Sequence, residues 1–170
     1  MQVIDNFLSE YVFTDLTDTL LSAEFPWYYN EYEVYPNDDN ILFTHTLHTC
    51  KGIPPYSDID YSSRYYNMLK PIFYKLGVRK LVRCKANLNP RTFSHKMGEF
   101  HIDNCLDSKQ SGKTAILYLN TNNGWTEFKK GGKVKSVANR VVIFDPTLEH
   151  RGVTSTDEKR RVVINFNYDV

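Results

Sequence analysis

Cysteine is scarce in this chain of 170 residues, and its three cysteines form no Cys-x-x-Cys pair. Because the number is odd, at least one of Cys50, Cys84 and Cys105 is unpaired. Free thiols in a reducing cytoplasm are the simplest interpretation. A chain of this length can bury a hydrophobic core without disulfides or a structural metal.

The sequence also lacks the segments that direct a chain to a membrane. The first residues, MQVIDNFLSEYVF, contain neither a basic leader nor an apolar signal region. No apolar run approaches the length of a membrane span. We therefore expect a soluble cytoplasmic protein with no membrane partner.

An excess of charge of one sign is absent as well. Lysine and arginine number 21 against 20 acidic residues, so the formal net charge is +1. This balance argues against a nucleic-acid partner and against nucleic-acid demethylation, because a protein that binds the phosphate backbone typically has a basic surface. Aromatic residues, in contrast, make up 14% of the chain and include 12 tyrosines, which suit a cleft or contact surface as well as a core.

No repeat, low-complexity tract or flexible linker divides the chain, so we predict one domain over residues 1–170. Helical periodicity predicts helices over about 14–23, with Thr14 as N-cap, and over about 61–76, ended by Gly77. After Gly77 the apolar period changes to two, which predicts a β region with strands near 81–88, 100–104, 114–121, 125–129, 133–138, 140–145 and 160–168. We expect a helical buttress over about 1–77 and a β core over about 78–170, built as a sandwich or distorted barrel.

The most informative pattern is His101-Ile102-Asp103, followed far downstream by His150 and by Arg160-Arg161. On a strand, alternate residues point to the same face, so His101 and Asp103 would lie side by side. Two imidazoles and one carboxylate on one side of a metal leave its other coordination positions open. That set suits non-haem Fe(II) that also binds a co-substrate and O₂. The arginine supplies a planar cation that can bind a carboxylate.

Side-chain parity predicts further polar groups near this pattern. If the apolar faces of the strands pack outward, the polar faces share one interior, and a polar interior in a barrel is a ligand pocket. The side chains assigned to that interior are Lys85, Asn87, His101, Asp103, Tyr118, Asn120, His150 and Arg161.

Over nearly its whole length the sequence resembles the 2-oxoglutarate- and Fe(II)-dependent oxygenases, specifically the prolyl 4-hydroxylase-like branch and its small phage-encoded relatives. The segments that carry the resemblance are VIDNFL, FPWYY, RCKANLNPRT, FHIDN, TAILYLNTNNGWTEF and NRVVIF-DPTLEHRG-RRVVINFNY. The resemblance implies a double-stranded β-helix, a jelly roll of the cupin-like kind, in which His101, Asp103 and His150 hold Fe(II). If the protein is phage-encoded, its compartment is the host cytoplasm.

The resemblance also implies roles for the second half of the site. Arg161 would pair with the distal carboxylate of 2-oxoglutarate, with Arg160 as the alternative. Tyr118 is similar to the position that hydrogen-bonds the co-substrate in the family, although a barrel-filling aromatic is an equal alternative. Further cofactor-binding candidates are Lys85, Asn87, Asn120 and Thr126. The implied reaction consumes 2-oxoglutarate and O₂, with ascorbate as a further candidate cofactor.

The sequence allows more than one class of substrate. Hydroxylation of a prolyl or other residue in a peptide or protein is the first expectation, and hydroxylation of a free amino acid or other small molecule is the second. A non-catalytic jelly-roll module that binds sugar or structural Zn²⁺ is the alternative from another class. We expect residues 51–60 to form a lid over the substrate, and Cys105 to be a thiol beyond the site.

Overall fold

A computed structural model describes residues 1–33, 40–53, 58–103 and 112–170 of the chain. Cys105 and the central part of the expected lid lie outside these ranges. Within them, no helix is both long and apolar enough to cross a membrane.

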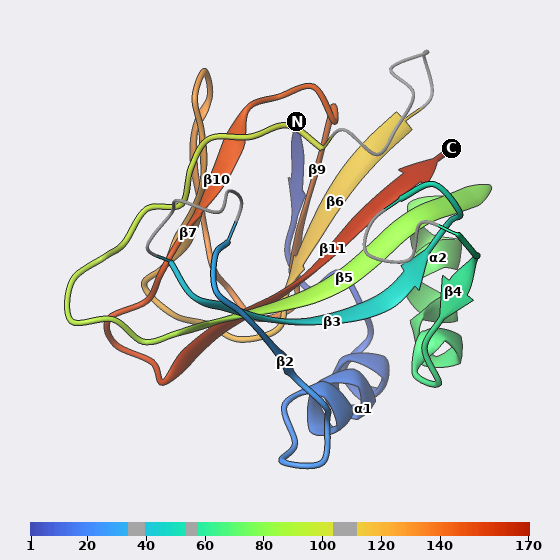
Figure 1. The fold of residues 1–170 in the computed structure, drawn as a ribbon, viewed down its shortest axis with the longest axis horizontal. Coiled ribbons are helices and arrows are strands. Elements are labelled where there is room, and N and C mark those ends of the chain that lie inside the picture. The colour runs from blue at the N-terminus through green and yellow to red at the C-terminus, as the bar shows by residue number, and fades with distance from the viewer. Residues whose placement is uncertain (34–39, 54–57, 104–111) are drawn as a thin grey trace.

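Within the described residues, eight strands form a large antiparallel sheet in the order β1-β9-β6-β11-β5-β3-β2, with β4 paired to β3 (Figure 1). Its strands are β1 (Gln2–Ile4), β2 (Tyr28–Asn30), β3 (Leu42–Thr49), β4 (Tyr61–Ser62), β5 (Lys80–Pro90), β6 (Gly112–Tyr118), β9 (Arg140–Phe144) and β11 (Arg160–Asp169). A small sheet has the order β10-β7-β8 and consists of β7 (Trp125–Phe128), β8 (Gly132–Lys135) and β10 (His150–Val153). The predicted fold class, mainly β with N-terminal helices, is confirmed.

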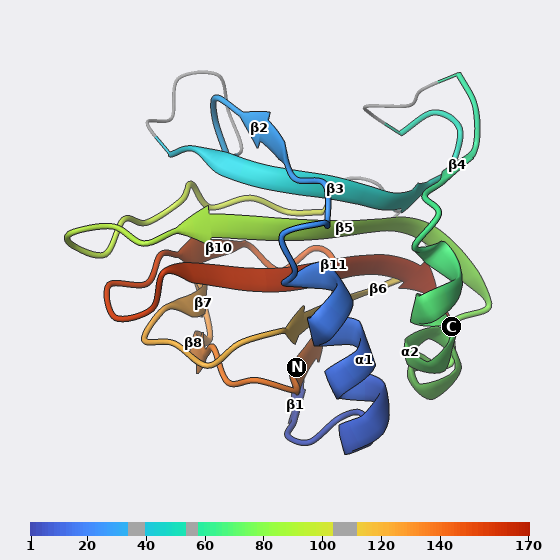
Figure 2. The ribbon, with the colours of Figure 1, turned by 90° about the horizontal axis from the view of Figure 1, so that it is seen from below.

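The two faces of the large sheet bury different groups of side chains. One face packs against the helices, and its cluster includes Ala86, Leu117 and Ile164 together with Leu16 of α1 (Glu10–Leu20) and Ile72 of α2 (Lys70–Leu76). The opposite face packs against the small sheet through a second cluster, formed by Ile116, Tyr118, Phe128, Val134, Val142, Phe144 and Val163. Figure 2 shows α1 and α2 together along one side of the large sheet. The period-two pattern therefore separated the two faces correctly, because neighbouring side chains on a strand point in opposite directions.

The helices differ from their predicted bounds. α1 begins at Glu10, directly after an extended Ser9, so Thr14 lies inside the helix and is not its N-cap. The single helix predicted over 61–76 is wrong, since this stretch contains β4, the 3₁₀ helix η1 (Tyr66–Leu69) and the seven-residue α2. Pro71 occupies the first turn of α2, where its missing N–H leaves no hydrogen bond unmade. Gly77 ends the helix as predicted, with the left-handed φ of 69° that glycine adopts readily.

The N-terminal part also contributes β1 to β4 to the large sheet, so the segment of about 1–77 is a mixture of helices and strands. No strand forms over 100–103, the described part of the stretch predicted near 100–104. His101 makes only an isolated antiparallel bridge with His150. This bridge, and not a continuous ladder, attaches the His-x-Asp segment to the small sheet.

Candidate active site

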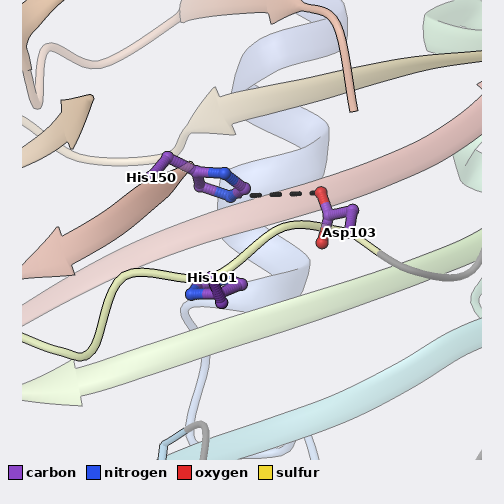
Figure 3. Close-up of side chains that lie close together, drawn as sticks. All are labelled: His101, Asp103 and His150. Carbon is purple, nitrogen blue, oxygen red and sulfur yellow. Dashed lines mark ion pairs between the residues drawn. The ribbon is translucent and has the colours of Figure 1, made fainter. Parts of the chain in front are cut away.

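His101, Asp103 and His150 meet between the two sheets (Figure 3). The backbone N–H of each histidine donates to the carbonyl oxygen of the other, at 3.0 and 2.9 Å, and the backbone N–H of Asp103 donates to Pro146 at 3.2 Å. The two imidazole centroids are 4.6 Å apart, and Nε2 of His150 lies 4.0 Å from Oδ2 of Asp103. One ligand atom from each residue falls within 4.8 Å of the others. The structure thus brings together the three predicted metal ligands.

The hydrogen bonds of both histidines suit metal binding through Nε2. Nδ1 of His101 donates to the carbonyl of Glu99 at 3.1 Å, and Nδ1 of His150 donates to that of Leu148 at 3.0 Å. A carbonyl only accepts, so each Nδ1 carries the proton and each Nε2 presents a lone pair. Nε2 of His150 is buried and has no hydrogen-bond partner among the residues that the structure describes. A buried polar atom without a partner is costly, and a divalent cation is the partner that this donor set fits.

A polar network holds the carboxylate of Asp103. Oδ1 accepts a hydrogen bond from Nη2 of Arg83 at 3.2 Å, and Oδ2 accepts one from Oγ1 of Thr114 at 2.9 Å. Asn167 joins these two donors, because it accepts from Nε of Arg83 and donates to Thr114, both at 3.1 Å. Burial opposes ionisation of Asp103, but Arg83, the neighbouring His150 and these hydrogen bonds outweigh it, so the pKa of Asp103 lies below its usual value. Burial, with a contribution from the adjacent His150, also lowers the pKa of His101. Both ligands therefore favour the deprotonated form that binds metals.

Arg161 lies deep between the sheets, with 3% of its surface exposed. Its Nε donates to Oγ of Ser136 at 3.0 Å, and its Nη2 donates to Oγ1 of Thr126 at 3.1 Å. The hydroxyl of Tyr118 donates to the same Thr126 oxygen at 2.7 Å, and the guanidinium carbon is 5.7 Å from the Tyr118 ring centroid. Arg161, Thr126 and Tyr118 thus form one buried cationic cluster. Arg160 points to the other side of the sheet, where its Nη2 donates to the carbonyl of Leu21.

The remaining predicted pocket residues divide into two groups. Lys85 and Asn87 lie on the inward face of β5, and Asn165 of β11 is paired with Lys85 across the strands. In the described part of the chain, the buried Oδ1 atoms of Asn87 and Asn165 have no hydrogen-bond partner, and the same holds for Nε2 of His150. Asn120 is placed differently, because its carboxamide donates to the carbonyl of Arg160 at 2.8 Å and accepts from the N–H of Val162 at 3.0 Å. Its side chain connects the end of β6 to β11.

The carboxamide oxygen of Asn89 accepts a hydrogen bond from Nη1 of Arg161 at 3.5 Å. Sequence reasoning missed this residue and four others that position the site, namely Arg83, Thr114, Ser136 and Asn167. Strand alternation could have identified four of them. Arg83 and Asn89 lie on the same face of β5 as Lys85 and Asn87. Thr114 lies on the same face of β6 as Tyr118, and Asn167 on the same face of β11 as Arg161. Ser136 follows β8 in the opposite sheet, and no period in the sequence signals that it contacts Arg161.

No model of a known protein family matches the sequence, and no curated protein matches it significantly. Solved structures do match. An oxidoreductase of the 2OG-Fe(II) oxygenase family from Burkholderia pseudomallei superposes with a TM-score of 0.67 at 12% identity, covering 98% of this chain and 84% of the other. A prolyl hydroxylase from Trichoplax adhaerens, in complex with a peptide from a hypoxia inducible factor, gives 0.61 at 14% identity, with coverage of 99% and 83%. A prolyl-4-hydroxylase from Pseudomonas putida gives 0.59 at 15% identity, with coverage of 99% and 92%. The chain therefore has the double-stranded β-helix fold of the 2-oxoglutarate- and Fe(II)-dependent oxygenases.

Proposed function

We propose that the protein is a 2-oxoglutarate- and Fe(II)-dependent dioxygenase that hydroxylates a prolyl or other residue of a peptide or protein. The observation that carries the proposal is the buried Nε2 of His150, which has no hydrogen-bond partner within the described ranges and faces Asp103 at 4.0 Å beside His101. Two imidazoles and one carboxylate with open coordination positions are the ligand set of non-haem Fe(II) oxygenases. The fold shared with that family supports the same conclusion.

Each part of the site has a role in this reaction. His101, Asp103 and His150 would hold the metal, and the network of Arg83, Thr114 and Asn167 orients the carboxylate. Bound Fe(II) would supply O₂ activation coupled to conversion of 2-oxoglutarate to succinate and CO₂, with one oxygen atom inserted into a substrate C–H bond.

The cationic cluster is suited to the co-substrate. Arg161 would bind the distal carboxylate of 2-oxoglutarate, because a buried guanidinium favours an anionic partner. The hydroxyls of Thr126 and Tyr118 lie at this cation and would add polar contacts. Asn87 and Asn165 offer carboxamides that still lack a partner at Oδ1, so they can bind polar groups of a ligand in the same interior.

The proposal of a peptide or protein substrate is supported by the comparisons. Two of the three structures above are prolyl hydroxylases, and one of them is bound to a peptide fragment. Cytoplasmic location, phage origin and the use of ascorbate stay predictions from the sequence.

The test begins with an anaerobic titration of the protein with Fe(II) and 2-oxoglutarate, which should produce a metal-to-ligand charge-transfer band. Folded protein that develops no band would favour the non-catalytic jelly-roll module. Once the band is established, O₂ is admitted and succinate is measured with and without ascorbate. Mass spectrometry of candidate peptides and of free amino acids for one added oxygen atom then distinguishes the two substrate classes.

A further inference from the structure

The cation of Arg161 has a specific acidic neighbour. Its guanidinium donates to neutral acceptors, namely the hydroxyls of Ser136 and Thr126 and the carboxamide oxygen of Asn89, which is 3.5 Å from Nη1. Burial lowers the pKa of Arg161, while the charges of Tyr118 and Glu33 act in the opposite direction. Burial also raises the pKa of Tyr118, which keeps this phenol neutral at neutral pH. Glu33 is therefore the carboxylate whose negative charge acts on Arg161.

Two glycines make room for the Glu33 carboxylate. The N–H of Gly98 donates to the carbonyl of Gly152 at 3.0 Å, so the two backbones lie side by side. A methyl group at Gly98 would come within 2.8 Å of Oε2 of Glu33. One at Gly152 would lie 3.0 Å from Oε1 of Glu33 and 3.6 Å from Nη1 of Arg161. A single methyl group added at Gly152 would thus contact both side chains, so one oxygen of the Glu33 carboxylate lies near Nη1 of Arg161.

Glu33 comes from the segment just after β2, whereas Gly152 lies in β10, the strand that begins with the metal ligand His150. The carboxylate thus reaches, from a distant part of the chain, the pocket that would bind the distal carboxylate of 2-oxoglutarate. Two carboxylates at one buried cation repel each other strongly, because the surroundings screen charge poorly.

We propose that Glu33 is an internal competitor of the co-substrate, whose carboxylate stands at Arg161 and is displaced when 2-oxoglutarate binds. This inference rests on the proposed function of the site. Because Glu33 must leave Arg161 first, the apparent affinity for 2-oxoglutarate equals the intrinsic affinity multiplied by the fraction of molecules in which Arg161 is already accessible. Displacement also couples co-substrate binding to movement of the Glu33 side chain.

Two variants remove the competitor in different ways. Glu33→Gln removes the charge. Gly98→Ala keeps the charge, but its new methyl group would lie 2.8 Å from Oε2 of Glu33 and would force this flexible carboxylate to shift. The contact of the methyl group with the carbonyl oxygen of Gly152, at 3.4 Å, is an ordinary one. The matched control is Glu31→Gln, which removes the same charge from an exposed position in the same segment.

The measurement is the anaerobic charge-transfer titration with Fe(II) and 2-oxoglutarate, together with thermal unfolding of the apo protein. Both Glu33→Gln and Gly98→Ala should tighten 2-oxoglutarate binding by roughly tenfold, the gain expected if about a tenth of the molecules are open in the native chain. Glu33→Gln should also lower the apo melting temperature, because Arg161 loses its anion. Glu31→Gln should change neither quantity.

The outcomes separate the two proposals. Unchanged or weaker 2-oxoglutarate binding in both variants, with a normal band in the native protein, would overturn the competitor role of Glu33 and leave the proposed function standing. A lower melting temperature with unchanged affinity would show a purely structural role. Absence of the band in the native protein would overturn the proposed function, and the competitor role with it. If Glu33→Gln fails to fold, Gly98→Ala alone decides.

Discussion

Nη2 of Arg83 lies 3.2 Å from Oδ1 of Asp103, so the carboxylate that would bind the metal is also half of an ion pair. Asp103 is 6% exposed, and its other oxygen is the one that faces His150. Arg83 and Thr114 together hold the two carboxylate oxygens from one side. This arrangement orients Oδ2 toward the imidazoles before any metal is bound.

Removal of the arginine should therefore weaken metal binding. We expect Arg83→Met, which keeps an apolar stem, to lower Co(II) affinity about tenfold, as is typical for partners that orient a metal ligand. Thr114→Val removes the other hydrogen bond without a change of charge and should act in the same direction. Co(II) absorption titration of the apo protein measures both. A rise in affinity in Arg83→Met alone would contradict the orienting role and show that Arg83 competes with the metal for Asp103.

The two neighbouring arginines should differ sharply in their effect on the co-substrate. Arg161→Ala should raise the dissociation constant of 2-oxoglutarate about 100-fold, because truncating one partner of a buried charge pair typically costs at least 2 kcal/mol. Arg160→Ala removes only a hydrogen bond to Leu21 on the helical side, so it should cost about 1 kcal/mol of stability and leave co-substrate binding unchanged. Titration of the charge-transfer band compares them. The opposite ranking would reassign the carboxylate anchor to Arg160.

Metal binding should stabilise the fold. At a free metal concentration about 100 times the dissociation constant, linkage contributes about 2.7 kcal/mol. For a domain of this size that corresponds to an increase in melting temperature of roughly 5–10 °C. His150→Ala should abolish the increase, whereas His95→Ala, which removes a histidine bonded to the carbonyl of Thr154, should keep it. Scanning calorimetry with and without Co(II) checks this, and an equal increase in His150→Ala would place the metal elsewhere.

Stability of the apo protein should fall as the pH decreases below about 6.5. Burial lowers the pKa of His45 and of His48 below that ordinary value, so the unfolded chain binds more protons than the folded chain in this range. The free energy of unfolding therefore rises with pH there and levels off above pH 6.5. His45→Gln should flatten the slope, while its lost bonds to Pro26 and Ser63 lower stability at every pH. Urea unfolding over a pH series measures both effects, and an unchanged slope would contradict the role of His45.

Local sequence patterns were sufficient to predict the faces of the strands and to select the three residues that meet at the candidate metal site. They were not sufficient to predict the bounds of the elements or the contacts between the two sheets. The alternation in β5 correctly grouped Lys85 and Asn87, because the direction of a side chain on a strand depends only on its position in the chain. The bounds of α1 depended on the extended conformation of Ser9, and the stretch over 61–76 was divided by the pairing of β4 with β3. Helical periodicity contains no information about such pairing, so the predicted single helix was wrong.

By itself, the sequence determined that Arg160 and Arg161 point to opposite faces, since neighbouring side chains on a strand alternate. Strand alternation does not explain the closeness of His101 and Asp103, because no strand forms over 100–103. The tertiary structure decided which face is inward, because that depends on where the helices pack. It also decided that His150 is bridged to His101, that Ser136 and Thr126 hold Arg161, and that Glu33 approaches the same cation. These contacts join segments that lie far apart in the chain, and they form only when the two sheets close on each other.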